Sequence, residues 1–242
     1  MIGLTTAILL ASAEPSTPYS GFESLKSRGH DATLCTADAR ICIATPESSL
    51  LTVTRDGKEI ARWAPDTEGG DLSFSPMPAL LRLSGGRLLV GALGTRSTSY
   101  SGGGGSATEQ VLVLVEPDKA AKPVLSLPES GSLMIRACFT EQDFKRRAGA
   151  CHAEFRFSAT LEATTAIAGT LPVLHFRMVA SHYPRGASRD GDSLSDRPLR
   201  RADLTWQTDT RCTFERTFSF DVSSERYVES AALPDCTDYV VP

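Results

Sequence analysis

The 242-residue sequence contains no asparagine, only five lysines against twenty arginines, and no histidine after His182. A net charge of −4 gives no reason to expect a nucleic acid or an anionic membrane as partner. The first apolar run, Ile2 to Leu10, is too short to span a bilayer, so we expect no membrane insertion. The arginine bias and the missing asparagine indicate a GC-rich coding sequence and therefore a bacterial source.

The sequence also lacks the spacings that identify metal and cofactor sites. There is no Cys-x-x-Cys pair, and His152 is the only histidine beside a cysteine, so zinc is not expected. The glycines of Tyr100-Ser-Gly-Gly-Gly-Gly-Ser106 lack the Gly-x-x-x-x-Gly-Lys-Ser/Thr spacing of a phosphate-binding loop. We therefore predict no cofactor.

One tetrapeptide, Gly191-Asp-Ser-Leu194, resembles the nucleophile block of GDSL esterases and lipases. The resemblance implies Ser193 as nucleophile, placed after a buried strand and served by a downstream Asp-x-x-His. Here the preceding residues 183–190 are rich in turn formers and charge, and no histidine follows Ser193. Because a serine hydroxyl needs a positioned base to become a good nucleophile, we interpret this stretch as a polar loop.

The first thirteen residues predict a secretory signal peptide. Ile2 to Leu10 form a short apolar core, and Ala11-Ser-Ala13 provides a small-x-small cleavage pattern, although no basic residue precedes the core. A buried first strand or helix is the alternative. A cleaved signal places the mature protein in the periplasm or outside the cell.

Six cysteines in the mature region fit disulfides formed in such an oxidising compartment. Six cysteines allow fifteen connectivities, and we expect sequential pairing. A two-residue turn at Asp38-Ala39 would set the first two cysteines opposite each other across a hairpin. The predicted pairs are Cys35–Cys42, Cys138–Cys151 and Cys212–Cys236.

Alternating apolar and polar residues dominate the rest of the chain. Residues 153–161, 174–180 and 212–220 each place Phe, Leu, Met, Ala or Cys on one face, and in the first and last of them polar residues occupy the other, which is typical of half-buried antiparallel strands. Arg216 interrupts the apolar face of the last of these. Val111-Leu-Val-Leu-Val115 predicts a strand buried on both faces.

Short turn signals connect these runs. Asp56-Gly57 favours a type I′ hairpin that pairs Val53 with Ile60, and Gly85-Gly86 marks a second hairpin. Thr140 is predicted to cap a short helix of two turns that ends near Arg147. The predicted fold is all-β, an antiparallel sandwich or barrel-like structure of many short strands with at most one or two short helices.

The best internal boundary is the Pro-rich region 116–131, which separates an N-terminal β region, 14–128, from a C-terminal β region, 129–242, that carries two disulfides. The two regions are either separate domains or parts of one continuous domain.

The most unusual stretch is Tyr100–Ser106, because ordering four glycines costs backbone entropy. We expect a mobile hairpin tip between strands 87–93 and 111–115. If the loop forms a recognition site instead, Arg96, Tyr100 and Gly103 are its candidate ligand-contact residues.

The remaining polar clusters have ordinary explanations. His152-Ala-Glu154 lacks the Pro-Cys-x-x-Cys partner of zinc deaminases, and both side chains should point to solvent. Asp190, Asp192 and Asp196 lack the glycine and glutamate of a calcium loop. The basic clusters 145–147 and 197–201 are interpreted as solvated faces or salt-bridge partners.

Two functions from different classes remain. The first is an exported, non-catalytic β protein that binds another protein or a small-molecule ligand, since no paired nucleophile and base and no metal or cofactor pattern is found. The second is a periplasmic hydrolase whose active site assembles from distant segments, with His152, Glu154, His175 or His182. Hydrogen bonds between two of these side chains in a pocket would favour the hydrolase, whereas a broad aromatic surface would favour the binder.

Overall fold

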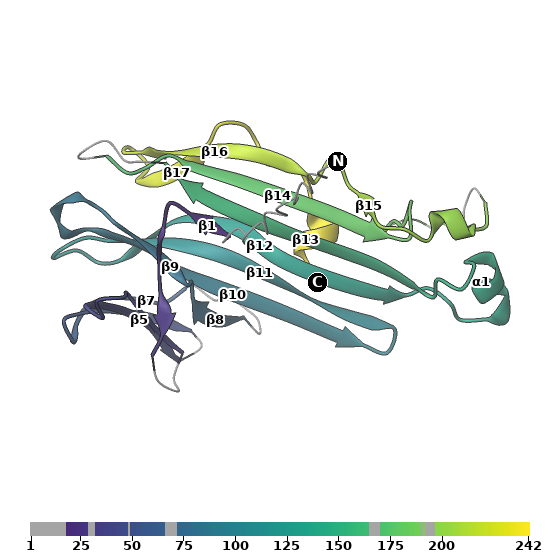
Figure 1. The fold of residues 1–242 in the computed structure, drawn as a ribbon, viewed down its shortest axis with the longest axis horizontal. Helices are drawn as coiled ribbons and strands as arrows, with labels where there is room; N and C mark the ends of the chain where they lie inside the picture. Colours follow the sequence, from purple (N-terminus) through teal and green to yellow (C-terminus); the bar gives the residue numbers. More distant parts are fainter. Residues whose placement is uncertain are drawn as a thin grey trace, which may run out of the picture.

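The computed structural model describes residues 18–28, 32–47, 49–65, 72–164, 170–189, 191 and 197–242. These residues form two mostly antiparallel sheets and two short α-helices, which confirms the predicted all-β, sandwich-like class (Figure 1). The predicted signal peptide, residues 1–13, lies outside the described residues.

The larger sheet has twelve strands, and its main path runs in the order β17-β16-β14-β13-β12-β11-β10-β9-β2. Three short strands pair beside this path, β1 with β13, β15 with β14 and β8 with β10. The strands on the path are β2 (Glu23–Ser24), β9 (Ala79–Arg82), β10 (Leu88–Tyr100), β11 (Gly103–Val115), β12 (Lys122–Arg136), β13 (His152–Ala163), β14 (Leu174–Tyr183), β16 (Phe214–Asp221) and β17 (Arg226–Glu229). The short strands are β1 (Tyr19–Ser20), β8 (Ser73–Pro76) and β15 (Gln207–Thr208).

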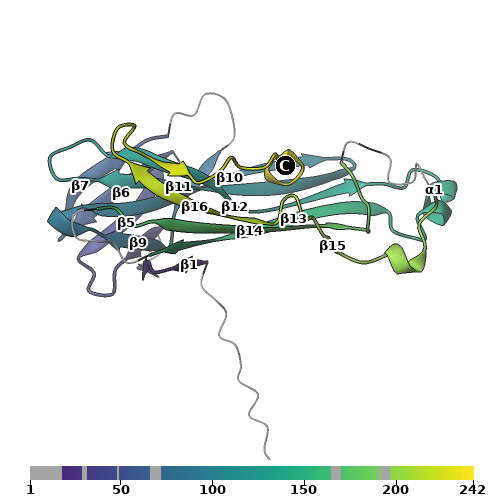
Figure 2. The same ribbon diagram turned by 90° about the horizontal axis from the view of Figure 1, so that it is seen from above.

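The smaller sheet has five strands in the order β3-β4-β5-β6-β7. Figure 2 shows it at the opposite end of the long sheet from helix α1. Its strands are β3 (Lys26–Ser27), β4 (Thr33–Cys35), β5 (Ile41–Glu47), β6 (Leu50–Arg55) and β7 (Lys58–Trp63). The helices are α1 (Glu141–Arg146) and α2 (Thr237–Val240), with 3₁₀ turns at Ser84–Gly86 and Arg201–Asp203. The boundary expected near residue 128 falls inside β12, which pairs with β11 on one side and β13 on the other.

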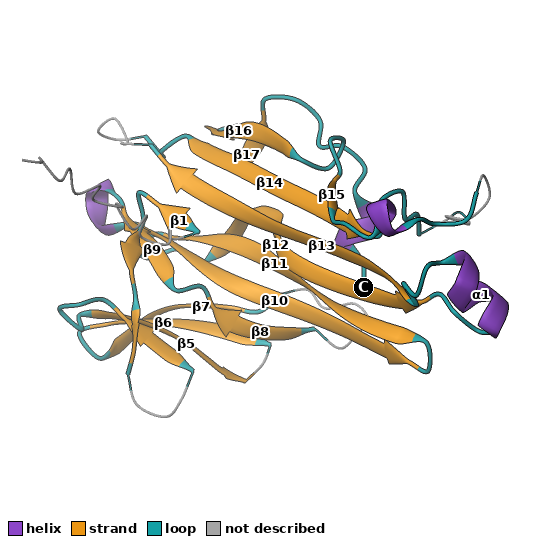
Figure 3. Cartoon of the chain, turned by 45° about the vertical axis from the view of Figure 1, so that its right-hand side comes forward, coloured by secondary structure: helices purple, strands orange, loops and turns teal. Residues whose placement is uncertain are grey.

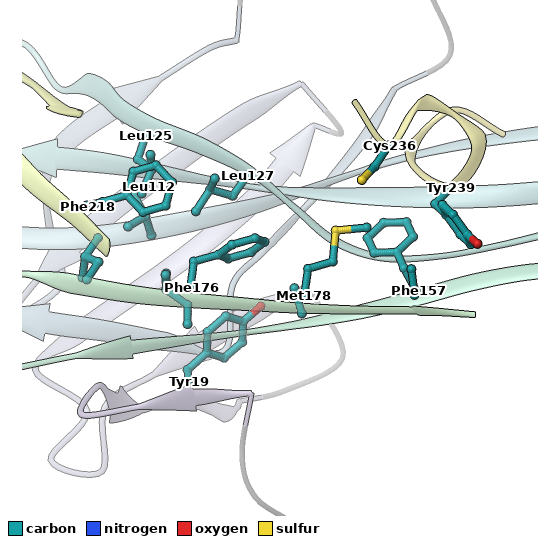
Figure 4. Close-up of a cluster of buried hydrophobic side chains, with 14 of the residues drawn as sticks. Tyr19, Leu112, Leu125, Leu127, Phe157, Phe176, Met178, Phe218, Cys236 and Tyr239 are labelled. Carbon is teal, nitrogen blue, oxygen red and sulfur yellow. The ribbon is translucent and has the colours of Figure 1, made fainter. Parts of the chain in front are cut away.

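Two apolar cores follow from the alternating strands. The first lies along the long sheet, where Figure 4 shows Leu125 and Leu127 of β12 near Phe176 and Met178 of β14. The second lies between the two sheets and includes Ile43, from β5 of the smaller sheet. Val111–Val115 is buried at all five positions, as predicted, because its odd-numbered residues contribute to the second core and Leu112 and Leu114 to the first. A strand shared by two cores must be apolar on both faces.

The predicted segments 153–161 and 174–180 are strands with the expected faces, and the strand predicted at 212–220 begins at Phe214, with Phe218 buried and Phe214 and Phe220 half-buried. In β13, for example, the residues from Ala153 to Ala163 are buried at every second position. Arg216 of β16 now has a physical explanation. Its guanidinium lies 5.2 Å from the centre of the Phe214 ring and its Nε donates to the carbonyl oxygen of Ala231 at 3.2 Å, so the stem covers apolar surface while the charge is hydrogen-bonded.

All three predicted disulfides form. Cys35 and Cys42 are directly opposite across the β4–β5 hairpin, as expected. The turn between them differs from the predicted one. The amide of Ala39 donates to the carbonyl oxygen of Thr36, so Ala37 and Asp38 are the central residues, one position earlier than predicted. Ala39, which follows this turn, has a left-handed backbone conformation with φ of 58°.

The predicted register of the Asp56-Gly57 hairpin is wrong by one residue. Both turn residues have positive φ, as a type I′ turn requires. Val53, however, pairs with Ala61, because a β-bulge between Val53 and Thr54 leaves Ile60 as the extra residue of β7. The Gly85-Gly86 hairpin forms and pairs Leu89 with Leu81.

The prediction of a mobile tip at Tyr100–Ser106 is also wrong. Gly103, Gly104 and Gly105 belong to β11 and pair with both β10 and β12. A Cβ atom on Gly105 would lie 2.5 Å from the carbonyl oxygen of Ser132, so the absent side chain lets the neighbouring backbone approach. Only Ser101 and Gly102 form the turn.

Candidate functional site

Several large apolar side chains are exposed near the end of the long sheet that carries α1. Phe139 is 70% exposed and Phe144 is 56% exposed. The β10–β11 turn and β15 approach the same end (Figures 1 and 3). We define the distal apolar patch by its five exposed members, which are Tyr100, Met134, Phe139, Phe144 and Trp206. It contains every exposed aromatic side chain among the residues described by the structure.

The Cys138–Cys151 disulfide closes the loop that presents the two phenylalanines. Within this loop Thr140 caps α1, as the sequence predicted. Its Oγ1 accepts from the amide of Asp143, and the Asp143 carboxylate accepts from the Thr140 amide in return. Hydrogen bonds from the Phe139 amide, which makes the largest contribution, and from the Thr140 side chain and amide lower the pKa of the Asp143 carboxyl. The Cys138–Cys151 disulfide therefore joins the two ends of the loop, and the Thr140 cap fixes the start of its helix.

Arginines contact the rings of the patch. The guanidinium carbon of Arg136 lies 5.0 Å from the centre of the Phe139 ring, and that of Arg156 lies 3.7 Å from the Trp206 ring. Trp206 also packs against Tyr183, with ring centres 5.8 Å apart. The sheet brings these groups together from strands distant in sequence, because Met134 pairs with Glu154 and Glu154 with Tyr183.

A second feature is a pocket of about 280 Å³ where the last residues of the sequence approach β10, β11 and β12. We call it the C-terminal pocket. Its charged lining residues are Arg96 and Glu109, and its apolar walls include Leu72, Leu127, Val240 and Val241. Glu109 accepts a 3.4 Å hydrogen bond from the Ser126 hydroxyl. No described residue forms a hydrogen bond or ion pair with the Arg96 guanidinium.

The segment that carries Val240 and Val241 is fixed at its start by the Cys212–Cys236 disulfide and by Tyr239. The buried Tyr239 hydroxyl donates to Oδ2 of Asp209 at 3.1 Å and lies 3.1 Å from Nδ1 of His182. Burial raises the pKa of Tyr239, and the adjacent Asp209 carboxylate raises it further. Tyr239 therefore stays protonated and attaches the segment to the long sheet (Figure 4).

The three candidate ligand residues do not form one site. Arg96 lines the C-terminal pocket. Tyr100, four residues further along β10, is 46% exposed in the distal apolar patch, with its hydroxyl 3.5 Å from the carbonyl oxygen of Met134. Gly103 is the first residue of β11 and pairs with Tyr100. Sequence reasoning missed Phe139, Phe144 and Trp206, because only exposure in the folded chain separates such residues from core residues.

The candidate hydrolase residues also do not converge on one site. His152 and Glu154 lie on the polar face near the start of β13. His175 pairs with Glu162 at the other end of that strand. Glu162 is ten residues from His152, which is roughly 33 Å at about 3.3 Å per residue. His182 pairs with the buried Phe155, on the opposite face of the sheet from Glu154, and contacts Tyr239 and Gln207. No two of these four side chains share a hydrogen bond in the described chain.

The polar face around His175 forms an open groove of about 530 Å³. Glu162, His175 and Thr217 follow one another across β13, β14 and β16, and Nδ1 of His175 lies 3.4 Å from the Thr217 hydroxyl. Arg177 and Glu215 form the adjacent ion pair at 3.5 Å. These groups are exposed and partly satisfy one another, as expected for a solvated sheet face.

The basic clusters divide between two roles. Arg147 is 4% exposed and its Nε donates to the carbonyl oxygen of Ala150 at 2.8 Å, so the solvated interpretation is wrong for this residue. Arg197 forms a bidentate ion pair with Asp203, as the salt-bridge interpretation predicted. Ser193 of the GDSL-like block and the acidic residues Asp190, Asp192 and Asp196 lie outside the described residues.

Comparison with known proteins adds no family. No protein-family model, no curated protein and no solved structure matches this chain. Within the described ranges, no group of three or more His, Cys, Asp or Glu side chains could hold a metal ion, and no helix is long and apolar enough to cross a membrane.

Proposed function

We propose that this chain is an exported, non-catalytic binding protein and that the distal apolar patch docks onto a partner protein. The observation that carries the proposal is the concentration of exposed aromatic side chains at one end of the long sheet. Exposed apolar patches on soluble proteins mark binding sites, and we infer that these side chains act as one such patch. A periplasmic or extracellular location, consistent with the three disulfides, belongs to the same proposal.

The composition of the patch favours a protein partner. Tyr, Trp, Phe, Met and Arg are enriched at protein interfaces, and truncating such anchors often costs most of the binding free energy. Here two arginines lie against Phe139 and Trp206 before any partner binds. An arginine stacked on a ring loses less side-chain freedom when it binds.

The stapled loop supports the same function. The Cys138–Cys151 disulfide and the Thr140 capping box hold Phe139 and Phe144 outward in the free protein. Because a pre-organised loop spends less entropy on association, its anchors contribute more to affinity. A partner with apolar pockets at the matching spacing is the occupant that we propose.

The alternative hydrolase is less well supported. His152 and Glu154 share one end and one face of β13, but His175 lies at the other end of the strand pair and His182 on the opposite face from Glu154. General acid–base catalysis needs such groups within hydrogen-bonding reach of each other or of a shared substrate atom.

Three immobilised baits test the proposal against a periplasmic extract. They are the wild type, the double variant Phe139→Ser/Phe144→Ser, and a control, Val222→Ser/Val228→Ser, whose exposed valines lie outside the patch on β17 and the turn before it. Thermal unfolding checks that all three are folded.

We expect one protein to bind the wild type and the control but not the phenylalanine variant. The purified partner should then bind the phenylalanine variant at least about tenfold more weakly by calorimetry. Equal binding of the partner to all three baits, or retention of nothing by the wild type, would contradict the proposal.

A further inference from the structure

We infer that the C-terminal pocket binds a free α-amino acid with an apolar side chain. This site is separate from the distal apolar patch, and the inference does not depend on the proposed protein partner. It rests on one arginine, one glutamate and an apolar wall that the fold gathers from segments distant in sequence.

The two charges are neighbours on one strand pair. Arg96 pairs with Ala107 and Gly94 pairs with Glu109, so Arg96 and Glu109 are diagonal residues of β10 and β11. Diagonal side chains lie roughly 7–8 Å apart at their backbones, within reach of one small ligand. Their side chains nevertheless form no ion pair with each other in the described structure.

Each charge retains capacity for a ligand. The Arg96 guanidinium has no partner among the described residues, and its planar donors match a carboxylate in bidentate geometry. Glu109 accepts only the 3.4 Å hydrogen bond from Ser126, which leaves lone pairs for an ammonium group. A simple anion would meet Arg96 but be repelled by Glu109, whereas a zwitterion satisfies both.

The remaining walls fit the body of such a ligand. Leu72, Leu127 and the adjacent Val240 and Val241 provide apolar surface from three segments. The volume of about 280 Å³ is close to the lower end of the roughly 300–1,000 Å³ typical of ligand pockets. A branched amino acid such as leucine is of the right size, and a drug-sized ligand is too large.

Calorimetric titration of the whole protein with four compounds tests the inference without any variant. Leucine carries both charges and the apolar group, 4-methylpentanoate lacks the ammonium, isoamylamine lacks the carboxylate, and glycine lacks the side chain. We expect leucine to bind and each of the other three to bind at least about tenfold more weakly.

Variants then locate the binding. Arg96→Ala and Glu109→Gln should each weaken leucine binding about tenfold or more, while Arg226→Ala, an exposed arginine of β17, should leave it unchanged. Three results would overturn the inference. They are no heat with leucine in the millimolar range, 4-methylpentanoate binding as tightly as leucine, and an Arg226→Ala effect as large as that of Arg96→Ala.

Discussion

The pairing of Gly103, Gly104 and Gly105 in β11 can be tested by alanine substitutions that change the stability of the protein. Gly105 pairs with Thr98 on β10 and with Leu133 on β12, whereas Gly102 lies in the turn three residues earlier. We expect Gly105→Ala to destabilise the protein and Gly102→Ala to leave its stability unchanged or slightly raised.

The distances to the neighbouring backbone give the magnitude. A Cβ on Gly105 would lie 2.5 Å from the Ser132 carbonyl oxygen, whereas ordinary contacts begin at 3.4 Å. The backbone of β12 must move, and overpacking of this kind costs about 1–3 kcal/mol. At about 2–4 °C per kcal/mol for a chain of this size, the Tm should fall by roughly 2–12 °C. A Cβ on Gly102 meets nothing closer than 3.6 Å, so reduced freedom of the unfolded chain should add about 0.4–1 kcal/mol at most.

Thermal unfolding followed by circular dichroism, with disulfides intact, measures both variants against the wild type. Gly104→Ala serves as a second strand variant, because its Cβ would lie 2.7 Å from the carbonyl oxygen of Thr98. If all three variants unfold at the wild-type temperature, these glycines lie in a mobile tip and the three-strand pairing is refuted.

Two further predictions concern stability. The hydrogen bonds from Arg197, and then from the Arg200 amide, lower the pKa of the buried Asp203 carboxyl. The ionised Asp203 carboxylate therefore stabilises the folded protein fully when the pH is above the unfolded pKa of about 3.9. This stabilisation is lost as the pH falls through the lower pKa of the folded protein. The unfolding free energy of Asp203→Asn, measured in urea, should fall less steeply than that of the wild type between about pH 5 and pH 2, and parallel curves would refute this origin. Reduction of the three disulfides should unfold the protein or nearly so, because the loop-entropy relation gives about 2.5 to 3.5 kcal/mol each against a typical total of about 5–15 kcal/mol. Near-ultraviolet circular dichroism with and without a thiol reductant measures this loss, and an unchanged Tm after reduction would contradict it.

Local pattern in the sequence was sufficient to predict several of the strands and their buried faces, and sequential pairing predicted the disulfides. The alternation of residues 153–161 is a property of the strand itself, and Cys35 and Cys42 are close enough in sequence for one turn to bring them together. The cap of α1 at Thr140 is equally local.

Only the tertiary structure decided where those strands sit and what their exposed faces present. The bulge at Ile60 and the pairing of Gly105 on both sides depend on the neighbouring strands, which the local sequence does not specify. The distal apolar patch and the C-terminal pocket both combine segments distant in sequence, such as Arg96 with Val241. An alternating pattern tells which residues share a face, but long-range packing determines whether that face is covered by other residues or left open to a partner.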